Sequence, residues 1–141
     1  MSAVVFVDTN ILIYAHDRDA GEKRDRAIAK LRDLWDSGTG RLSVQVLQEF
    51  YVNVTQKLST PLARSTAREI VKTYGAWIHQ ATTVETVIRA TEITELARIS
   101  FWDALIVASA EQAGAEEVFS EDMNDGQAIV GIKIVNPLAA A

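Results

Sequence analysis

One stretch decides the fold: Val4-Val5-Phe6-Val7-Asp8-Thr9-Asn10, in which an apolar run ends abruptly in a carboxylate, a hydroxyl and an amide. A continuous apolar run without polar alternation is typical of a strand buried on both faces, as in parallel sheets covered by helices. Asp8 then falls at the carboxyl end of that strand, the edge where open α/β sheets bind their ligands. A plainer role also fits, because Asp8 or Thr9 would cap a helix that follows.

The rest of the chain alternates between helical periodicity and short apolar runs. A short helical turn is expected over residues 11–15, and helices over 22–36, 44–58, 61–74, 83–97 and 101–113. Thr60-Pro61 suits the start of the fourth helix, and Thr82 with Glu85 has the spacing of a capping box before the fifth. Further strands are expected at 41–43, 76–78, 118–119 and within 129–135. This alternation predicts an α/β fold, a three-layer α/β/α sandwich with a central, mainly parallel sheet.

The composition is that of an ordinary globular protein. With 141 residues, 48% of them hydrophobic, the chain suits one domain over residues 1–141. No apolar run is long enough to cross a bilayer, and the absence of cysteine excludes disulfides and thiolate metal sites and fits a cytoplasmic protein. The net charge of −5 argues against a general basic surface for nucleic acid, although bound cations would supply the missing positive charge.

Three acids stand at the ends of predicted elements: Asp8 after the first strand, Asp103 at the start of an apolar helix, and Asp122 after a late strand. Each also has a simpler explanation. Ser100 and Asp103 have capping-box spacing, and Asp122 lies in a polar turn. Glu49 falls on the polar side of its helix, where the helical wheel alone suggests exposure to solvent.

The topology nevertheless favours convergence of these acids, because the carboxyl ends of parallel strands meet at one sheet edge. Two like charges about 4 Å apart repel by roughly 4 kcal/mol at an effective dielectric constant of 20. A cluster of three or four carboxylates must therefore be protonated or neutralised by a divalent cation. Ligands that offer only oxygen suit Mg²⁺ or Mn²⁺ better than zinc.

Four runs of the sequence resemble the successive motifs of PIN domains, and most of all those of the VapC toxins of type II toxin–antitoxin pairs. The runs are Phe6-Val7-Asp8-Thr9-Asn10-Ile11-Leu12, Ser43-Val44-Gln45-Val46-Leu47-Gln48-Glu49-Phe50, Ser100-Phe101-Trp102-Asp103-Ala104-Leu105-Ile106 and Ser120-Glu121-Asp122-Met123. They occur in order, at fitting separations, over essentially the whole chain.

The resemblance implies a metal-dependent endoribonuclease, a hydrolase that uses Mg²⁺ or Mn²⁺. Its catalytic and metal-binding acids would be Asp8, Glu49, Asp103 and Asp122. Three residues would support them: Asn10 by orienting Asp8, Ser120 as a hydroxyl before the last acid, and Asp125 as a supplementary acid in the same turn. The resemblance also directs Glu49 towards the site instead of bulk water.

The resemblance further implies partners. These are an RNA substrate, a cognate antitoxin protein that blocks the acidic pocket, and a second copy of the chain in a homodimer, with no membrane. The helical pair over residues 44–74 is the candidate antitoxin groove, although most of its apolar residues also suit a core. Arg64, Arg68 and Lys72, together with Lys57, would guide an RNA backbone or form an ordinary solvated face.

Two other functions stay open on the sequence alone. A phosphatase of the haloacid-dehalogenase type also has an Asp after its first strand, but it needs a second acid two residues later, where this chain has Asn10. A non-catalytic PIN scaffold that binds RNA or protein would not need the acids to converge.

Overall fold

The computed structural model describes residues 3–139. Its elements, in chain order, are β1 (Val5–Val7), α1 (Thr9–Ala15), α2 (Glu22–Ser37), β2 (Gly40–Arg41), α3 (Val44–Gln56), α4 (Arg64–Tyr74), the 3-10 helix η1 (Gly75–Trp77), α5 (Val84–Ala97), α6 (Phe101–Gln112), β3 (Glu117–Phe119), β4 (Ala128–Ile129) and β5 (Ile132–Val135). The strands form one sheet in the order β2-β1-β3-β5-β4. All neighbours are parallel except β4, which is antiparallel to β5.

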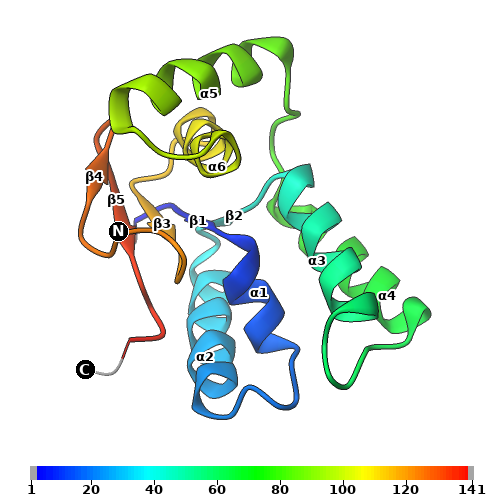
Figure 1. Ribbon diagram of the computed structural model, residues 1–141. Helices are drawn as coiled ribbons and strands as arrows, with labels where there is room; N and C mark the ends of the chain where they lie inside the picture. The colour runs from blue at the N-terminus through cyan, green and yellow to red at the C-terminus, as the bar shows by residue number, and fades with distance from the viewer. Residues whose placement is uncertain (1–2, 140–141) are drawn as a thin grey trace.

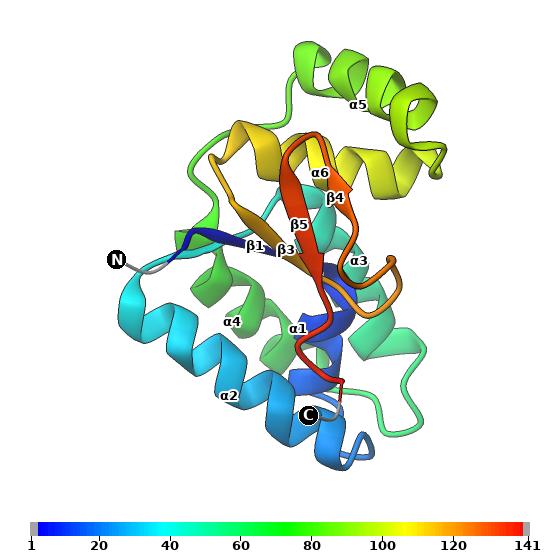
Figure 2. The ribbon, with the colours of Figure 1, turned by 90° about the vertical axis from the view of Figure 1, so that its left-hand side faces the viewer.

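The sheet is the middle layer of a three-layer α/β/α sandwich, as the sequence predicted. Helix α6 covers one face, with α5 on its outer side, while α1 and α2 lie on the other face (Figures 1 and 2). Helices α3 and α4 pack together beside α1 (Figure 1). Within residues 3–139, no helix is both long and apolar enough to cross a membrane.

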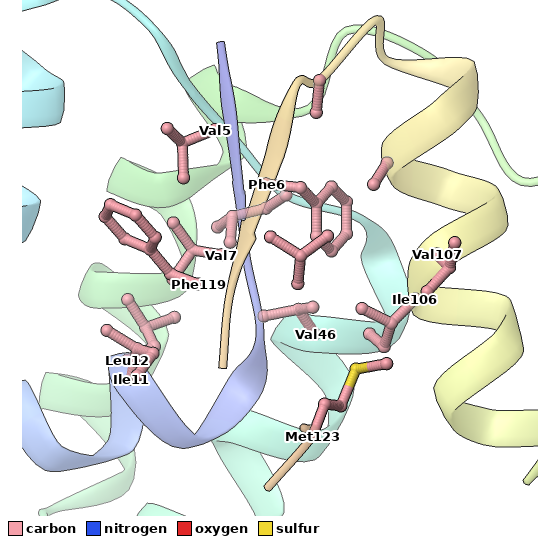
Figure 3. Packing of buried hydrophobic residues seen from close by; sticks show 14 of the residues in the cluster. Val5, Phe6, Val7, Ile11, Leu12, Val46, Ile106, Val107, Phe119 and Met123 are labelled. Atoms are coloured by element: carbon pink, nitrogen blue, oxygen red, sulfur yellow. The ribbon is translucent and has the colours of Figure 1, made fainter. Parts of the chain in front are cut away.

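The apolar run that decides the fold is the interior strand β1, flanked by β2 and β3. Phe6 and Val7 are completely buried. Figure 3 shows why neither face tolerates polar residues: Phe6 points towards α6, where Ile106 and Val107 lie, whereas Val7 points to the opposite face. The strand is therefore buried on both sides, and its direction delivers Asp8 to the carboxyl edge of the sheet.

Residues 76–78 do not form a strand, and this prediction was wrong. The segment follows α4 as the 3-10 helix η1, and the buried ring of Trp77 lies against Gly40 of β2. The Trp77 ring lies 4.6 Å from that of Trp35 and 5.1 Å from that of Tyr74, centroid to centroid. One hydrogen bond from Leu42 N to the Trp77 carbonyl is what remains of the expected strand pairing. An aromatic cluster has taken precedence over the local strand propensity.

Two predicted helix starts are also corrected. Helix α4 begins at Arg64 and not at Pro61, because Leu62 N donates to the Val54 carbonyl at 2.8 Å and holds the connecting segment against α3. The capping box of α5 pairs Thr83 with Thr86, one residue later than expected. Thr86 is the better partner because its hydroxyl is buried and also donates to Gln112 of α6. The last strand predicted within residues 129–135 is β5, which pairs with β4 in a hairpin. In the turn of this hairpin, Val130 and Gly131 both have positive φ.

Gly40 is expected to be irreplaceable in β2. In Gly40→Ala, the added methyl group would lie 2.8 Å from ring atoms of Trp77, which is held by Trp35 and Tyr74. Overpacking of this kind should lower the free energy of unfolding by about 1–3 kcal/mol, measured by urea denaturation. Gly75→Ala is the control, because its methyl group would meet no atom within 4 Å and its φ of −54° suits alanine. Equal losses in the two variants would contradict the role of the Trp77 contact.

Candidate active site

A pocket of about 150 Å³ opens at the carboxyl edge of β1. It receives one acid from each of four separate places: Asp8 after β1, Glu49 from α3, Asp103 from the first turn of α6, and Asp122 from the loop after β3. The remaining lining residues are Thr9, Asn10, Ile13, Gln45, Trp102 and Ile106. The structure therefore places the four acids that the sequence singled out around one cavity.

Asp8 is both a helix cap and the most buried of these acids. Its Oδ1 accepts from Thr9 N at 2.7 Å, which caps α1, and its backbone N donates to the Phe119 carbonyl of β3 at 2.9 Å. The backbone of Asp8 is thus held by β3, and its side chain is held by the start of α1. Burial raises the pKa of Asp8 from its ordinary 3.8 to about 6; the hydroxyl of Ser120 and the backbone of Thr9 oppose the rise, while Asp122 and Asp103 add to it.

Ser120 is the buried hub of the site. Its Oγ donates to Asp8 Oδ2 at 2.8 Å and accepts from the backbone N of Asp122 at 3.2 Å and of Met123 at 3.3 Å. The side chain is completely buried. One hydroxyl therefore sets both the orientation of the Asp8 carboxylate and the start of the loop that carries Asp122.

Asn10 connects the same two acids from the solvent side. Its amide nitrogen donates to Asp8 Oδ2 and to Asp122 Oδ2, each at 3.1 Å, and its Oδ1 accepts from Glu121 N at 2.9 Å. This agrees with the prediction that Asn10 orients Asp8 and extends it, because the same amide also positions Asp122.

Glu49 reaches the pocket although it is exposed, which reconciles the helical wheel with the family resemblance. Gln45, one turn earlier on α3, donates to Glu49 Oε1 at 2.8 Å, and Thr9 Oγ1 donates to Oε2 at 3.5 Å. The polar side of α3 is therefore the wall of a polar pocket.

Asp103 occupies the third position of α6, and the capping interaction suspected from the sequence exists. Its backbone N donates to Ser100 Oγ at 3.1 Å. The side chain still lines the pocket. Partial burial raises its pKa, the Ser100 hydroxyl opposes this, and the negative charge of Asp122 adds to it. Capping by Ser100 thus holds Asp103 at the pocket.

Asp125 does not join the pocket. Its Oδ1 accepts from the backbone N of Asn136 at 2.9 Å and so ties the acidic loop to the segment after β5. Sequence spacing could not separate the two acids, because Asp122 and Asp125 lie in the same turn.

This loop has a second support, which was not predicted from the sequence. Glu121 accepts from the Tyr14 hydroxyl at 2.6 Å and pairs with the Lys23 ammonium at 2.8 Å. Lys23 also lies 5.0 Å from the centre of the Tyr14 ring. Helices α1 and α2 together therefore clamp the residue that precedes Asp122. Only its position beside Asp122 distinguishes Glu121 in the sequence.

The donors of the pocket suit a hard divalent cation, but their side chains are not gathered around one point. Among the residues that the structure describes, no three acids or histidines are close enough to form a ready metal site. Asp122 and Glu49 are instead turned to the amides of Asn10 and Gln45. The negative charges of Asp122 and Asp103 nevertheless lie near enough to add to the raised pKa of Asp8, and that of Asp122 adds to the raised pKa of Asp103. Oxygen donors that repel one another fit Mg²⁺ or Mn²⁺, which would replace the amide contacts.

The fold and the pocket together define an α/β domain with an acidic site at the carboxyl edge of a parallel sheet. The sequence pattern of the PIN domain matches residues 5–125, and the chain belongs to the PIN domain family. This confirms the family resemblance drawn from the four motifs.

Two solved structures have the same fold. A toxin–antitoxin complex from Klebsiella pneumoniae aligns with a TM-score of 0.69 and 20% identity, covering 94% of this chain and 97% of the other. The VapC20 toxin of Mycobacterium tuberculosis, which cleaves the sarcin–ricin loop, aligns with a TM-score of 0.60 and 22% identity, covering 84% and 91%. No curated protein sequence matches the chain significantly.

Proposed function

We propose that this protein is a metal-dependent endoribonuclease and the toxin of a type II toxin–antitoxin pair. The observation that carries the proposal is that Asp8, Glu49, Asp103 and Asp122 come from four elements to line one pocket. Membership of the PIN family, and a fold shared with a chain of a toxin–antitoxin complex and with the VapC20 toxin, support it. Membership of the family also argues against the haloacid-dehalogenase alternative. Asn10 argues against it too, because it occupies the position that would need a second acid and its amide orients Asp8.

Each acid has a role that follows from its setting. Asp8 and Asp103 are proposed as cation ligands, because one is fixed by the sheet and the other by the start of α6. Glu49, which is exposed, would hold a cation or accept a proton from the attacking water, and Asp122 would complete the site. When bound, Mg²⁺ or Mn²⁺ would activate that water and stabilise the negative charge on the phosphodiester. Asn10 and Ser120 position the ligands throughout.

The antitoxin is proposed to bind between α3 and α4. An apolar groove of about 490 Å³ lies there, lined by Val44, Leu47, Gln48, Tyr51, Val52, Arg68 and Val71. Val44 and Val52 are exposed, which suits a face covered by a partner. Lys72, which the sequence offered as an RNA contact, pairs with Glu69 at 3.2 Å. The homodimer and the cytoplasmic location stay predictions.

Metal dependence is the decisive test of this function. The purified protein should cleave single-stranded RNA with Mg²⁺ or Mn²⁺ and lose cleavage in EDTA. The cation should also raise the melting temperature, because it relieves repulsion among the carboxylates. RNA cleavage that continues in EDTA, and in an Asp103→Asn variant, would contradict the metal mechanism. RNA binding without cleavage under every metal would instead indicate a non-catalytic scaffold.

A further inference from the structure

The pocket has one wall that the acid chemistry does not use. Trp102, the second residue of α6, lines the same cavity as Asp8 and Asp103, and its side chain is 64% exposed. By contrast, Trp77 is buried and Trp35 is 38% exposed within the aromatic cluster of α2 and α4. An indole that is exposed to solvent at the rim of an active-site cavity offers a flat, apolar surface on which a ligand can stack.

The indole is also held in place. The ring of Phe101 packs against it edge to face, with centroids 5.1 Å apart at an interplanar angle of 80°. Trp102 follows the capping residue Ser100 by two positions, so the start of α6 fixes its backbone together with that of Asp103. A rigid aromatic ring loses little conformational entropy when a ligand stacks on it.

The charges of the pocket indicate how a ligand would bind there. None of the residues that line the cavity, within residues 3–139, is lysine or arginine, and four are acids. Basic side chains therefore supply no attraction for a phosphate backbone at this point, and the whole chain carries a net charge of −5. Stacking of a base on an aromatic ring is largely independent of charge, so it would hold RNA where basic side chains do not.

We infer that Trp102 is the platform on which one unpaired base of the RNA substrate stacks beside the acidic pocket. This inference rests on the proposed ribonuclease function and makes it more specific: the substrate is single-stranded at the cleaved site, and one base next to that bond is bound by its face. Stacking on the face of a base accepts any of the four bases, whereas an abasic nucleotide offers no face on which to stack. Trp102 is thus a positioning residue for the substrate and takes no part in the reaction itself.

Binding is tested with a 12-nucleotide oligo(A) RNA and tryptophan fluorescence. The RNA should quench part of the emission of the wild type and of Trp35→Phe, the matched control whose indole lies outside the pocket. Trp102→Phe keeps an aromatic face and should bind within a few-fold of the wild type, but without that quenching. Trp102→Leu should bind about 10-fold more weakly. Quenching that persists in Trp102→Phe, or unchanged binding in Trp102→Leu, would overturn the inference.

Cleavage kinetics locate the stacked base. In an RNA that the wild type cuts at one mapped bond, abasic sites are introduced one at a time around that bond. An abasic site at one position should raise the KM of the wild type about 10-fold and change its kcat by less than about three-fold. In Trp102→Leu, whose KM is already raised, the same abasic site should not raise KM further. Independent, additive effects would overturn the assignment. A second result would also overturn it: Trp102→Leu has a different oligomeric state in light scattering and loses equal affinity for intact and abasic RNA. The indole would then belong to an interface between protein chains.

The two proposals fail in different ways. Quenching that depends on Trp102, without cleavage under any divalent metal, would contradict the ribonuclease and retain the stacking platform. Metal-dependent cleavage that is unaffected by Trp102→Leu would retain the ribonuclease and remove the platform. The melting temperature of Trp102→Leu should stay close to that of the wild type, since the lost side chain is exposed.

Discussion

Asp8→Asn is expected to lose RNA cleavage by more than about 100-fold and, at the same time, to resist heat better than the wild type. Cleavage falls because an amide is a far weaker ligand for a hard divalent cation than a carboxylate. The substitution keeps the size of the side chain and its acceptor for Thr9 N, so the cap of α1 survives. A time course of RNA cleavage in Mg²⁺ measures the loss.

The gain in stability comes from the burial of a charge. Burial holds the pKa of Asp8 at about 6 in the folded chain, against 3.8 as its ordinary value. The folded state therefore binds the proton more tightly, so stability is lost as the pH rises from about 4 to about 6. Above that window the charged carboxylate costs roughly 3 kcal/mol. Asparagine avoids this cost, but its amide NH₂ then faces the Ser120 and Asn10 groups that donate to Asp8 Oδ2, which offsets part of the gain. At pH 7.5 without metal, the variant should melt several degrees higher, on the order of 5–10 °C, and the difference should vanish below about pH 4.

The control for Asp8→Asn is Asp33→Asn, on the exposed face of α2, which should change neither cleavage nor the melting temperature. Adding Mg²⁺ should stabilise the wild type more than Asp8→Asn, because the cation and the amide relieve the same repulsion. An Asp8→Asn protein that cleaves RNA like the wild type would show that Asp8 serves the fold and not the chemistry. A variant that melts lower at pH 7.5 would show that the lost hydrogen bonds from Ser120 and Asn10 outweigh the relief of the buried charge.

The sequence predicted the elements whose cause is local or periodic. The run that ends at Asp8 could only be a strand buried on both faces, and the apolar helix after Ser100 had to be interior. The prediction of a strand at residues 76–78 failed because a strand needs a partner edge, whereas the contacts of Trp77 with Trp35 and Gly40 join residues distant in sequence. Local propensity carries no information about such contacts.

The site residues were likewise predictable where their position depends on local sequence or strand topology. Three of its acids follow strands or begin a helix, so topology alone points them to one edge. Glu49 required the family resemblance, because a helical wheel does not distinguish a polar pocket wall from a solvated face. The resemblance pointed to Ser120 as a support, but its position as the hub depends on side-chain directions that only the folded chain fixes. The clamp on Glu121 has no sequence signal of its own.

Ser120→Ala is the second change expected to have a large effect, on stability and on cleavage together. It removes the donor to the buried Asp8 carboxylate and the acceptor of two backbone N–H groups, those of Asp122 and Met123. Leaving such groups unpaired should lower the free energy of unfolding by about 3 kcal/mol at pH 7.5, measured by urea denaturation. Cleavage should fall about 10- to 100-fold, because this hydroxyl sets both the orientation of the Asp8 carboxylate and the start of the loop that carries Asp122.

The pH dependence and a matched serine separate this role from simple packing. The Ser120 hydroxyl lowers the pKa of Asp8, so removing it raises that pKa further, and part of the stability loss should disappear below about pH 4, where Asp8 is protonated in both folded and unfolded chains. Ser109 on α6 is also buried, but its Oγ has no hydrogen-bond partner in the part of the chain that the structure describes. Ser109→Ala should therefore be neutral or slightly stabilising. Equal losses from the two serines, or a Ser120→Ala loss that is independent of pH, would mean that Ser120 fills space and does not hold Asp8.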